Sequence, residues 1–370
     1  MKGHNLTTLC LALALLTMLP LSGCAAEAEP QTTEVVRDAA YYRTHNLPIK
    51  TLSDTEVLIE SPAGIIVEEP TTFIEYQKMD DPVEQTGTIE RLDYTTDVYE
   101  DGVTYEKFVN VYLPYGYDQN DTQTKYNVLY FQHGNTQTPD SLNNSDGLRW
   151  FDNLFASGKV DPVIIVFTSY YLYPDKADEI RVSDSVEGGA PAGDGCYPSI
   201  PANFYREVVE DIIPLVESKY NTYTERFDEA GLIVSREHRC FSGYSRGGFC
   251  TWYMFHSALP YFKWWSPMSG CCSAGQGLVT DVSNEDAYAY LKDAIDANPN
   301  MDFFIYVGGG NYTDIPQLRD QMAYFEKQDA FSYGPDPEVN NLYYTVSNFA
   351  HGYFFTPYYY YNTLQIIFSE

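Results

Sequence analysis

Short apolar runs alternate with longer amphipathic stretches along most of this chain. The runs are rich in Val, Ile, Phe, Tyr and Trp, which is typical of buried strands. They cover residues 127–132, 163–168, 239–243, 262–267, 302–307 and 342–346. The clearest amphipathic stretch between them is 203–220, where apolar residues recur at helical spacing despite Pro214. This alternation predicts an α/β fold, with a mostly parallel central sheet and helices on both of its faces.

Two further strand-like stretches precede these runs. Apolar and polar residues alternate along 88–96 and 107–114, and the sequence Glu-Asp-Gly at 100–102 is a turn signal between them. The pattern predicts an antiparallel hairpin at the N-terminal side of the sheet.

The first residues have the pattern of an export signal. Lys2 precedes an apolar run at 9–21 that is too short to span a bilayer but suits the core of a signal peptide. The sequence Leu-Ser-Gly-Cys at 21–24 resembles a bacterial lipobox, in which Cys24 is lipidated and becomes the mature N-terminus. An ordinary signal peptide cut nearby is the alternative. We therefore expect an exported protein, either held at the cell surface through lipidated Cys24, its only membrane contact, or secreted.

Three segments follow from these patterns. Residues 1–23 are expected to be the signal peptide. Residues 24–70 are rich in Thr, Glu, Ala and Pro without sustained periodicity, and are expected to form a tether and an irregular lead-in. Residues 71–370 are expected to form one large α/β domain, since a chain of this length is within the range of a single unit.

Composition and charge narrow the class of protein. A hydrophobic content of 44% with 16% aromatic residues is ample for a packed interior. The formal net charge is −30, because 52 acidic residues oppose only 22 basic ones. Nucleic acid is therefore excluded as an expected partner, since binding to a phosphate backbone relies on clustered Lys and Arg.

The cysteines and histidines give no metal or redox pattern. The chain has seven cysteines and six histidines, but neither a CxxC pair nor an HExxH sequence. We expect no metal and no cofactor. Beyond the leader and Cys24, the cysteines are expected to be buried thiols with at most one or two bridges: Cys196, Cys240, Cys250, Cys271 and Cys272.

A serine motif lies where a strand is expected to meet a helix. In the sequence RCFSGYSRGG at 239–248, Gly243, Ser245 and Gly247 form a G-x-S-x-G pattern. It follows an apolar run and precedes the helical stretch 247–257, which is the context that a nucleophile elbow requires. Glycines on both sides let the backbone approach closely in such a turn. The placement predicts that Ser245 is a nucleophile.

A serine nucleophile needs a histidine that accepts its proton. Only His256 and His351 follow Ser245 in the chain, as the order of residues in this kind of site demands. His256 lies about 16 Å along the expected elbow helix and is too far away to act on Ser245. His351 follows the strand at 342–346, in a loop that reaches the carboxyl edge of the sheet, and is predicted to be the base.

The histidine needs a carboxylate that fixes its tautomer. Asp314 follows the strand at 302–307 and is the predicted acid, with a helix N-cap as its alternative role. Asp302 lies at the wrong end of that strand. The other aspartates in this part of the chain are expected in solvent-exposed helix positions: Asp286, Asp293, Asp296 and Asp320.

The oxyanion of an acyl-transfer intermediate requires two N–H donors. One is expected from Arg246, directly after the nucleophile. The other is expected from the loop after the run at 127–132, where Asn135 is the predicted donor and Thr136 the alternative. His133, in the same loop, is predicted to shape the loop and is also a candidate substrate contact.

Six sequence blocks in order resemble carbohydrate esterase family one, the esterase D-like group of feruloyl and acetylxylan esterases. They are NVYLPYGYD at 110–118, YNVLYFQHG at 126–134, GYSRGG at 243–248, SPMSG at 266–270, TDI at 313–315 and AHGY at 350–353. The resemblance runs from about residue 86 to the C-terminus. It implies an α/β-hydrolase fold, a metal-free Ser-His-Asp site at Ser245, His351 and Asp314, and acyl esters of plant polysaccharides or oligosaccharides as substrates.

One departure concerns the acyl group. Feruloyl members of that family often carry an aromatic residue after the fourth block, where this chain has Cys271, Cys272 and Ser273. Aromatic residues elsewhere are expected to contact substrate instead, namely Trp265, Tyr353 and Phe354. Core packing is the alternative for one residue of the pair Trp264 and Trp265, because neighbours on a strand point to opposite faces.

The expected function is therefore removal of feruloyl or acetyl groups from a plant cell-wall polysaccharide such as xylan. Two alternatives stay open from the sequence. One is an α/β-hydrolase of another class, such as a peptidase, and the other is a surface lipoprotein that binds glycans without catalysis.

Overall fold

The computed structural model describes residues 51–53, 56–60, 66–72, 83–135, 137–142, 145–173, 199–277, 281–309, 316–346, 351–353 and 356–368. The predicted signal peptide and Cys24 lie outside these ranges, and so do Thr136, Cys196, Asp314 and Phe354.

A mixed sheet forms the centre of the described chain. Its strands follow the order β1-β2-β11-β10-β9-β8-β6-β7-β5-β4, and β3 pairs with β2. Six consecutive strands of this sheet are parallel, and each lies in one of the apolar runs: β6 (Val128–Gln132), β7 (Ile164–Thr168), β8 (Arg239–Tyr244), β9 (Trp264–Met268), β10 (Phe304–Gly309) and β11 (Leu342–Val346). The predicted fold class is confirmed.

The predicted hairpin is formed by β4 (Thr88–Thr96) and β5 (Tyr105–Leu113), which pair in antiparallel register. Gly102 has a φ of 77° in the turn, a conformation that favours glycine. A buried ion pair joins this hairpin to α5 (Ser199–Glu207), because Lys107 Nζ lies 2.7 Å from a Glu207 carboxylate oxygen and neither side chain is exposed. Tyr94 and Tyr99 also donate hydrogen bonds to Glu207.

Part of the expected irregular lead-in forms strands. Three strands lie at its C-terminal end: β1 (Thr51–Ser53), β2 (Glu56–Glu60) and β3 (Ile66–Thr72). Strand β2 pairs antiparallel with β11 at Val346 and Glu60, and so extends the sheet. The interpretation of residues up to 70 as irregular is therefore wrong for these positions. Pro62 and Pro70 interrupt the alternation that would have indicated these strands.

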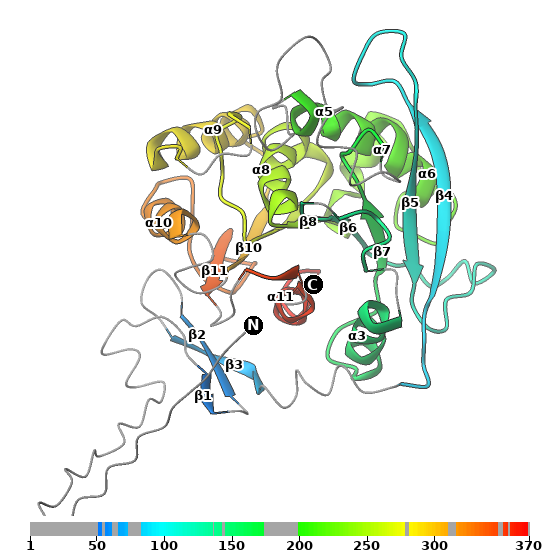
Figure 1. Ribbon diagram of the computed structural model, residues 1–370, viewed down its shortest axis with the longest axis horizontal. Coiled ribbons are helices and arrows are strands. Elements are labelled where there is room, and N and C mark those ends of the chain that lie inside the picture. The colour runs from blue at the N-terminus through cyan, green and yellow to red at the C-terminus, as the bar shows by residue number, and fades with distance from the viewer. Residues whose placement is uncertain are drawn as a thin grey trace, which may run out of the picture. The chain divides into compact units, whose positions relative to one another are not determined.

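Helices cover both faces of the sheet (Figure 1). Helix α8 (Arg246–Ala258) packs on β6, β8 and β9, with α5 and α9 (Asn284–Ala297) beside it, and α10 (Pro316–Phe325) lies against α9. On the opposite face α11 (Thr356–Thr363) packs on β9 and against α3 (Ser145–Ala156). Helix α7 (Glu229–Val234) lies close to the short 3₁₀ turn Arg236–His238 before β8.

The helix expected at 203–220 is divided. Helix α5 ends at Glu207, a π-helical turn covers Val208–Ile212, and α6 covers Ile213–Glu217. The Ile213 N–H donates to the carbonyl of Val208, five residues earlier. Pro214 has no N–H, and its ring would clash with the carbonyl four residues before it in a regular helix. The wider turn accommodates this proline, a detail that apolar spacing does not encode.

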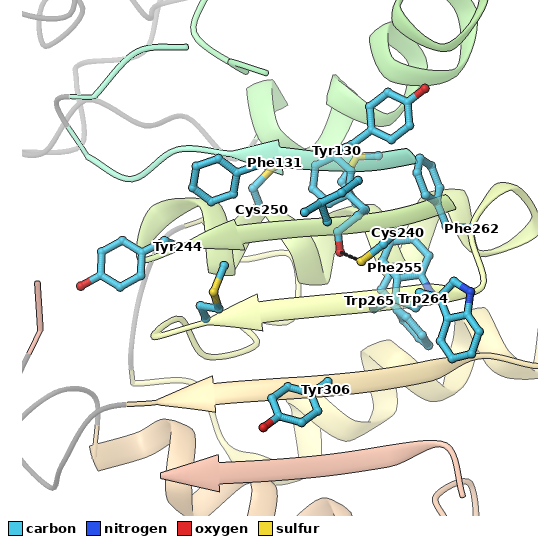
Figure 2. Packing of buried hydrophobic residues seen from close by; sticks show 14 of the residues in the cluster. Tyr130, Phe131, Cys240, Tyr244, Cys250, Phe255, Phe262, Trp264, Trp265 and Tyr306 are labelled. Atoms are coloured by element: carbon cyan, nitrogen blue, oxygen red, sulfur yellow. Dashed lines mark hydrogen bonds between the residues drawn. The ribbon is translucent and has the colours of Figure 1, made fainter. Parts of the chain in front are cut away.

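The core is continuous and rich in aromatic side chains, as Figure 2 shows along strands β6 to β10. Four cysteines that form no disulfide with one another lie buried in or beside it: Cys240, Cys250, Cys271 and Cys272. None of the helices in the described ranges is long and apolar enough to cross a membrane.

Candidate active site

Ser245 lies at a sharp turn between β8 and α8. Its φ of 56° and ψ of −114° are a strained conformation for a residue with a side chain. Two backbone hydrogen bonds hold it there, since the Ser245 N–H donates to Met268 O at 2.8 Å and the Phe249 N–H donates to Ser245 O at 3.0 Å. The strand-turn-helix geometry of a nucleophile elbow is therefore present.

The neighbouring glycines are required by backbone contacts. A Cβ atom on Gly247 would lie 2.0 Å from the carbonyl oxygen of Gln132, and one on Gly243 would lie 2.3 Å from that of Gly247. A Cβ atom on Gly270, after β9, would lie 2.5 Å from Ser245 O. Because backbone atoms of strands cannot move aside cheaply, only glycine fits at these positions.

His351 reaches Ser245 from the connection after β11. Its Nε2 atom lies 2.9 Å from Ser245 Oγ, although the two residues are 106 positions apart in the chain. The imidazole stacks on the ring of Tyr244, with 5.1 Å between centroids and 30° between planes. A neutral imidazole in this position can accept the hydroxyl proton through Nε2.

The loop after β6 lies against the same turn. A Cβ atom on Gly134 would lie 3.3 Å from Ser245 Cβ, so the backbone of this loop passes directly beside the serine. The Gly134 N–H donates to Gln137 Oε1 at 2.7 Å. Asn135 follows in an exposed turn, and Arg246 is the first residue of α8, where N–H groups have no acceptor within the helix.

His133 holds this loop from inside and does not face substrate. It is only 1% exposed, so its interpretation as a substrate contact is wrong and its loop-shaping role is the one that fits. Its Nδ1 lies 2.8 Å from the carbonyl oxygen of Gly134, which can only accept, and its Nε2 lies 2.8 Å from Ser169 Oγ. The proton of the neutral ring is therefore on Nδ1. Burial lowers the pKa of His133 to about 4.

Trp265 is also ruled out as a substrate contact. Its side chain is completely buried between Phe255 and Phe262, in the half of β9 that is remote from Ser245. Trp264 is 3% exposed and lies at the start of the same strand. The sequence indicated aromatic residues on β9 but not how far they lie from the end of the strand near Ser245. That distance depends on the register of β9 with β8 and β10.

Tyr353 lies close to the serine site. Its ring packs at 5.8 Å from that of Tyr244 and stacks at 6.2 Å on Phe131, leaving the side chain half-buried. Its contact with substrate stays a prediction. Phe354, the other predicted aromatic contact, lies outside the described residues.

The predicted acid, Asp314, lies outside the described residues, in the connection between β10 and α10. The aspartates that were not predicted as the acid have other positions and partners. Asp302 pairs with Arg236 and Lys263 at the other end of β10, and the rest are exposed on helices: Asp286, Asp293 and Asp296 on α9, and Asp320 on α10. His256 stacks on Tyr290 with 3.9 Å between centroids, as a structural histidine.

Tyr244 and Gln137 are site residues that sequence reasoning missed. Tyr244 directly precedes Ser245 and provides the surface on which His351 stacks. The side-chain oxygen of Gln137 accepts a hydrogen bond from the Gly134 N–H. The position of Tyr244 beside Ser245 was a signal, but stacking depends on a residue more than a hundred positions away. In the described ranges, no cluster of three or more His, Cys, Asp or Glu side chains has the arrangement of a metal site.

The parallel sheet, the strained serine between β8 and α8 and the histidine after β11 define an α/β-hydrolase. The chain belongs to the esterase family described as "Putative esterase", whose family model matches residues 105–330. The resemblance to feruloyl esterases is confirmed by a solved feruloyl esterase module that is 27% identical and is described below.

Two curated relatives are longer proteins that match this chain over only part of their own length. Endo-1,4-beta-xylanase Y of Acetivibrio thermocellus is 29% identical over 293 residues, which is 78% of this chain and 24% of the relative. An endo-1,4-beta-xylanase/feruloyl esterase of Xylanibacter ruminicola is 27% identical over 187 residues, 49% of this chain and 21% of the relative. The chain thus spans less than a quarter of the length of these curated relatives.

Solved structures share the fold. A mutant of the feruloyl esterase module from Clostridium thermocellum, complexed with sinapinate, is 27% identical with a TM-score of 0.62, over 79% of this chain and 92% of that one. A CE1 ferulic acid esterase from Anaeromyces mucronatus, in complex with ferulic acid, is 20% identical with a TM-score of 0.53, over 79% of this chain and 95% of that one. The second likeness shows the fold alone.

Proposed function

We propose that this esterase removes feruloyl or acetyl groups from a plant cell-wall polysaccharide such as xylan, through an acyl-enzyme on Ser245. The observation that carries the proposal is the 2.9 Å contact between His351 Nε2 and Ser245 Oγ at a strained strand-helix turn. A histidine recruited from the far end of the chain to such a serine is the arrangement that nucleophilic catalysis requires.

The proposed reaction has two halves. His351 Nε2 takes the proton of Ser245 Oγ while that oxygen attacks the ester carbonyl carbon, and the carbonyl electron pair moves onto its oxygen. The backbone N–H groups of Arg246 and Asn135 stabilise this oxyanion. The carbonyl then re-forms, the sugar oxygen leaves with the proton from His351, and water attacks the acyl-enzyme by the same route. Asp314 orients the imidazole.

The acyl group is proposed from relatives and from the site together. Sinapinate in the related feruloyl esterase module and the xylanase relatives favour a phenolic ester on xylan. In this chain Cys271, Cys272 and Ser273 are each at most 1% exposed and do not line an open acyl pocket. Tyr353 packs beside Tyr244, and we propose it as the aromatic residue that contacts a phenolic acyl group.

Turnover by point variants tests the mechanism. Ser245→Ala and His351→Ala should each lower kcat on methyl ferulate or on feruloylated arabinoxylan by about 10⁶-fold. His256→Ala is the matched control and should keep the wild-type rate, because that histidine contacts Tyr290 and Ser257 and not Ser245. Asp314→Asn should lower kcat by about 10⁴-fold, whereas Asp320→Asn, on the exposed side of α10, should not.

Substrate comparisons separate the alternatives. Release of ferulate from arabinoxylan, or of acetate from acetylated xylan, identifies the acyl group. A peptidase would instead cleave the matched amide. Ser245→Ala that retained more than a hundredth of the wild-type rate would disprove the serine mechanism, and failure of a phosphonate probe to label Ser245 would favour a glycan-binding protein without catalysis.

A further inference from the structure

A cavity of about 470 Å³ lies at the edge of the sheet opposite to Ser245. Its lining comes from residues before β6, β8, β9 and β11 and from the C-terminal segment: Asn127, Tyr223, Glu237, His238, Lys263, Trp264, Pro337, Glu338 and Phe368. Strand β8 runs between this edge and the serine, which puts the cavity roughly 20 Å from the active site. Figure 2 shows the two edges, with Trp264 at one end of the strands and Tyr244 at the other.

One wall of the cavity is an aromatic platform that is held in place before any ligand arrives. The ring of Tyr223 stacks on His238 with 3.5 Å between centroids and 6° between planes. His238 is fixed in turn, because its Nδ1 lies 2.8 Å from Asn127 Oδ1. Tyr223 is nevertheless 40% exposed. An ordered, exposed ring loses little conformational entropy when it binds a ligand.

A second wall is also aromatic and fixed. The indole N–H of Trp264 donates to Glu237 O at 2.6 Å. The ring of Phe368 meets that of Trp264 edge-on, with 6.0 Å between centroids. Trp264 is 3% exposed, so the half-buried Phe368 provides more of the accessible ring surface of this wall.

The polar groups of the cavity define the charge of its ligand. Glu237 and Glu338 are exposed carboxylates there, and the cation, Lys263, already pairs with Asp302 at 2.9 Å. These carboxylates and the net charge of −30 disfavour an anionic ligand. A purely apolar ligand would strip water from the carboxylates without replacing their hydrogen bonds. A neutral ligand with hydroxyl donors and an apolar face satisfies both conditions, and a pyranose ring has this chemistry.

A second, smaller cavity lies beside the first. Its volume is about 160 Å³, and it shares Asn127 and Phe368 with the first. It continues along the same edge of the sheet past the start of β7, with Lys159, Asp161 and Gln365 among its polar lining residues. Two cavities with common walls favour a chain of sugars over a single ring.

We propose that these two neighbouring cavities, which share Asn127 and Phe368 and are called here the amino-edge groove, bind a neutral stretch of polysaccharide separately from the ester-cleaving site. The choice of a plant polysaccharide as the polymer rests on the proposed function, whereas recognition of a neutral saccharide rests on the groove itself. A polymer held at the amino edge raises the local concentration of its esters at Ser245.

Binding to the full chain carrying Ser245→Ala tests the proposal, because esterolysis is then absent. Xylohexaose and unsubstituted xylan are the probes, with calorimetry and affinity electrophoresis as the measurements. Adding Tyr223→Ala should weaken binding at least 10-fold, and Tyr223→Phe, which keeps the stack, should restore it. Tyr115→Ala is the matched control, since Tyr115 is an exposed tyrosine at 59% outside the groove; it should leave affinity unchanged.

Activity gives an independent result. With Ser245 intact, Tyr223→Ala should keep the wild-type rate on methyl ferulate but lower the rate on insoluble feruloylated xylan. Equal affinity of Tyr223→Ala and its parent for both xylan probes would overturn the groove proposal, even if esterolysis is observed. Binding of a cationic glucosamine oligomer in preference to xylohexaose would overturn the neutral ligand. Tyr223-dependent binding without any esterolysis would instead leave the groove intact and disprove the proposed function.

Discussion

Ser245 shows how neighbouring backbone segments hold a strained residue. Its backbone conformation is costly, of the order of 1–3 kcal/mol for a residue outside the usual regions. The glycines at 243, 247 and 270 let three backbone segments close around the serine, and two backbone hydrogen bonds fix it. The backbone therefore holds the Ser245 hydroxyl at the carboxyl edge of the sheet, within 2.9 Å of His351 Nε2.

His133 is predicted to make folding stability depend on pH. Its pKa is about 4 in the folded state because of burial, and about 6.5 in an unfolded chain. Between these values the unfolded state binds a proton that the folded state does not, so stability is complete above pH 6.5 and falls as pH decreases towards 4. His133→Asn, which keeps a donor for the Gly134 carbonyl but cannot titrate, should have a smaller loss of unfolding free energy over this range in denaturant titrations.

The comparison with the variant isolates His133 from other groups that titrate in the same range. An equal loss of unfolding free energy for wild type and His133→Asn between pH 6.5 and 4 would contradict the assignment. The expected difference is up to about 3 kcal/mol, from a pKa change of about 2.5 at 1.36 kcal/mol each.

At this scale the sequence predicted two residues, Ser245 and His351, that the structure brings into contact. Ser245 lies between a strand and a helix that are adjacent in the chain, and His351 follows a strand, so both could be found. Trp265 was placed wrongly because the alternation of faces tells which way a strand residue points but not how far it lies from the carboxyl edge. The stacking of Tyr244 on His351 joins distant segments, and no local pattern encodes it.

At the scale of elements, a buried cluster fastens the hairpin β4–β5 to α5. Lys107 and Glu207 form its ion pair, and Tyr94 and Tyr99 donate to the same carboxylate. Burial lowers the pKa of Lys107, while the Glu207 charge opposes that change. The cluster lies immediately before the π-helical turn, so it anchors the divided helix at its N-terminal part.

Removing one charge of this pair should cost more than removing both. Lys107→Met leaves an unpaired carboxylate in the interior and should lower the unfolding free energy by about 3–5 kcal/mol. Adding Glu207→Gln removes that charge. Its amide oxygen can accept from one tyrosine and its NH2 group can donate to the hydroxyl of the other, so the double variant should regain most of the loss. Chemical denaturation of the two variants measures the difference. Identical losses would show that packing, and not charge, fixes the hairpin.

Elements were predicted best where burial is complete. The six parallel strands are mostly apolar and therefore stand out in the sequence. Strands β1 to β3 did not, because the prolines and the polar residues in and around them hide the alternation. The division of the helix at 203–220 depends on a single residue, Pro214, whose effect on hydrogen bonding is independent of apolar spacing.

For the whole molecule, the parallel direction of β6 and β8 to β11 brings residues far apart in the chain to one edge. The serine after β8 and the histidine after β11 meet there, and the predicted acid follows β10. The amino-edge groove lies at the other end of the same strands. Reaction and polymer binding are therefore proposed on opposite edges of one sheet.

A lipid on Cys24 would place this assembly at the cell surface, which we propose as its location. In the native host, the wild-type protein should fractionate with membranes, and mass spectrometry of its N-terminal peptide should show acyl chains on Cys24. Cys24→Ser should lose both properties, because acylation occurs at that thiol. An unmodified terminus downstream of Cys24, found in the culture medium, would contradict the proposal and favour free secretion.

The four buried cysteines can be used to measure local unfolding of the core. Cys240, Cys250, Cys271 and Cys272 are out of reach of a reagent in the folded chain, and burial also raises the pKa of Cys271 and Cys272 to about 12. Alkylating reagents attack the thiolate, so these positions are modified only during excursions that expose them. Peptide-resolved alkylation rates would then separate the breathing of the segment after β9, which carries Cys271 and Cys272, from opening of β8, which carries Cys240. The alkylation rates of these native cysteines would thus give the order in which parts of the interior unfold.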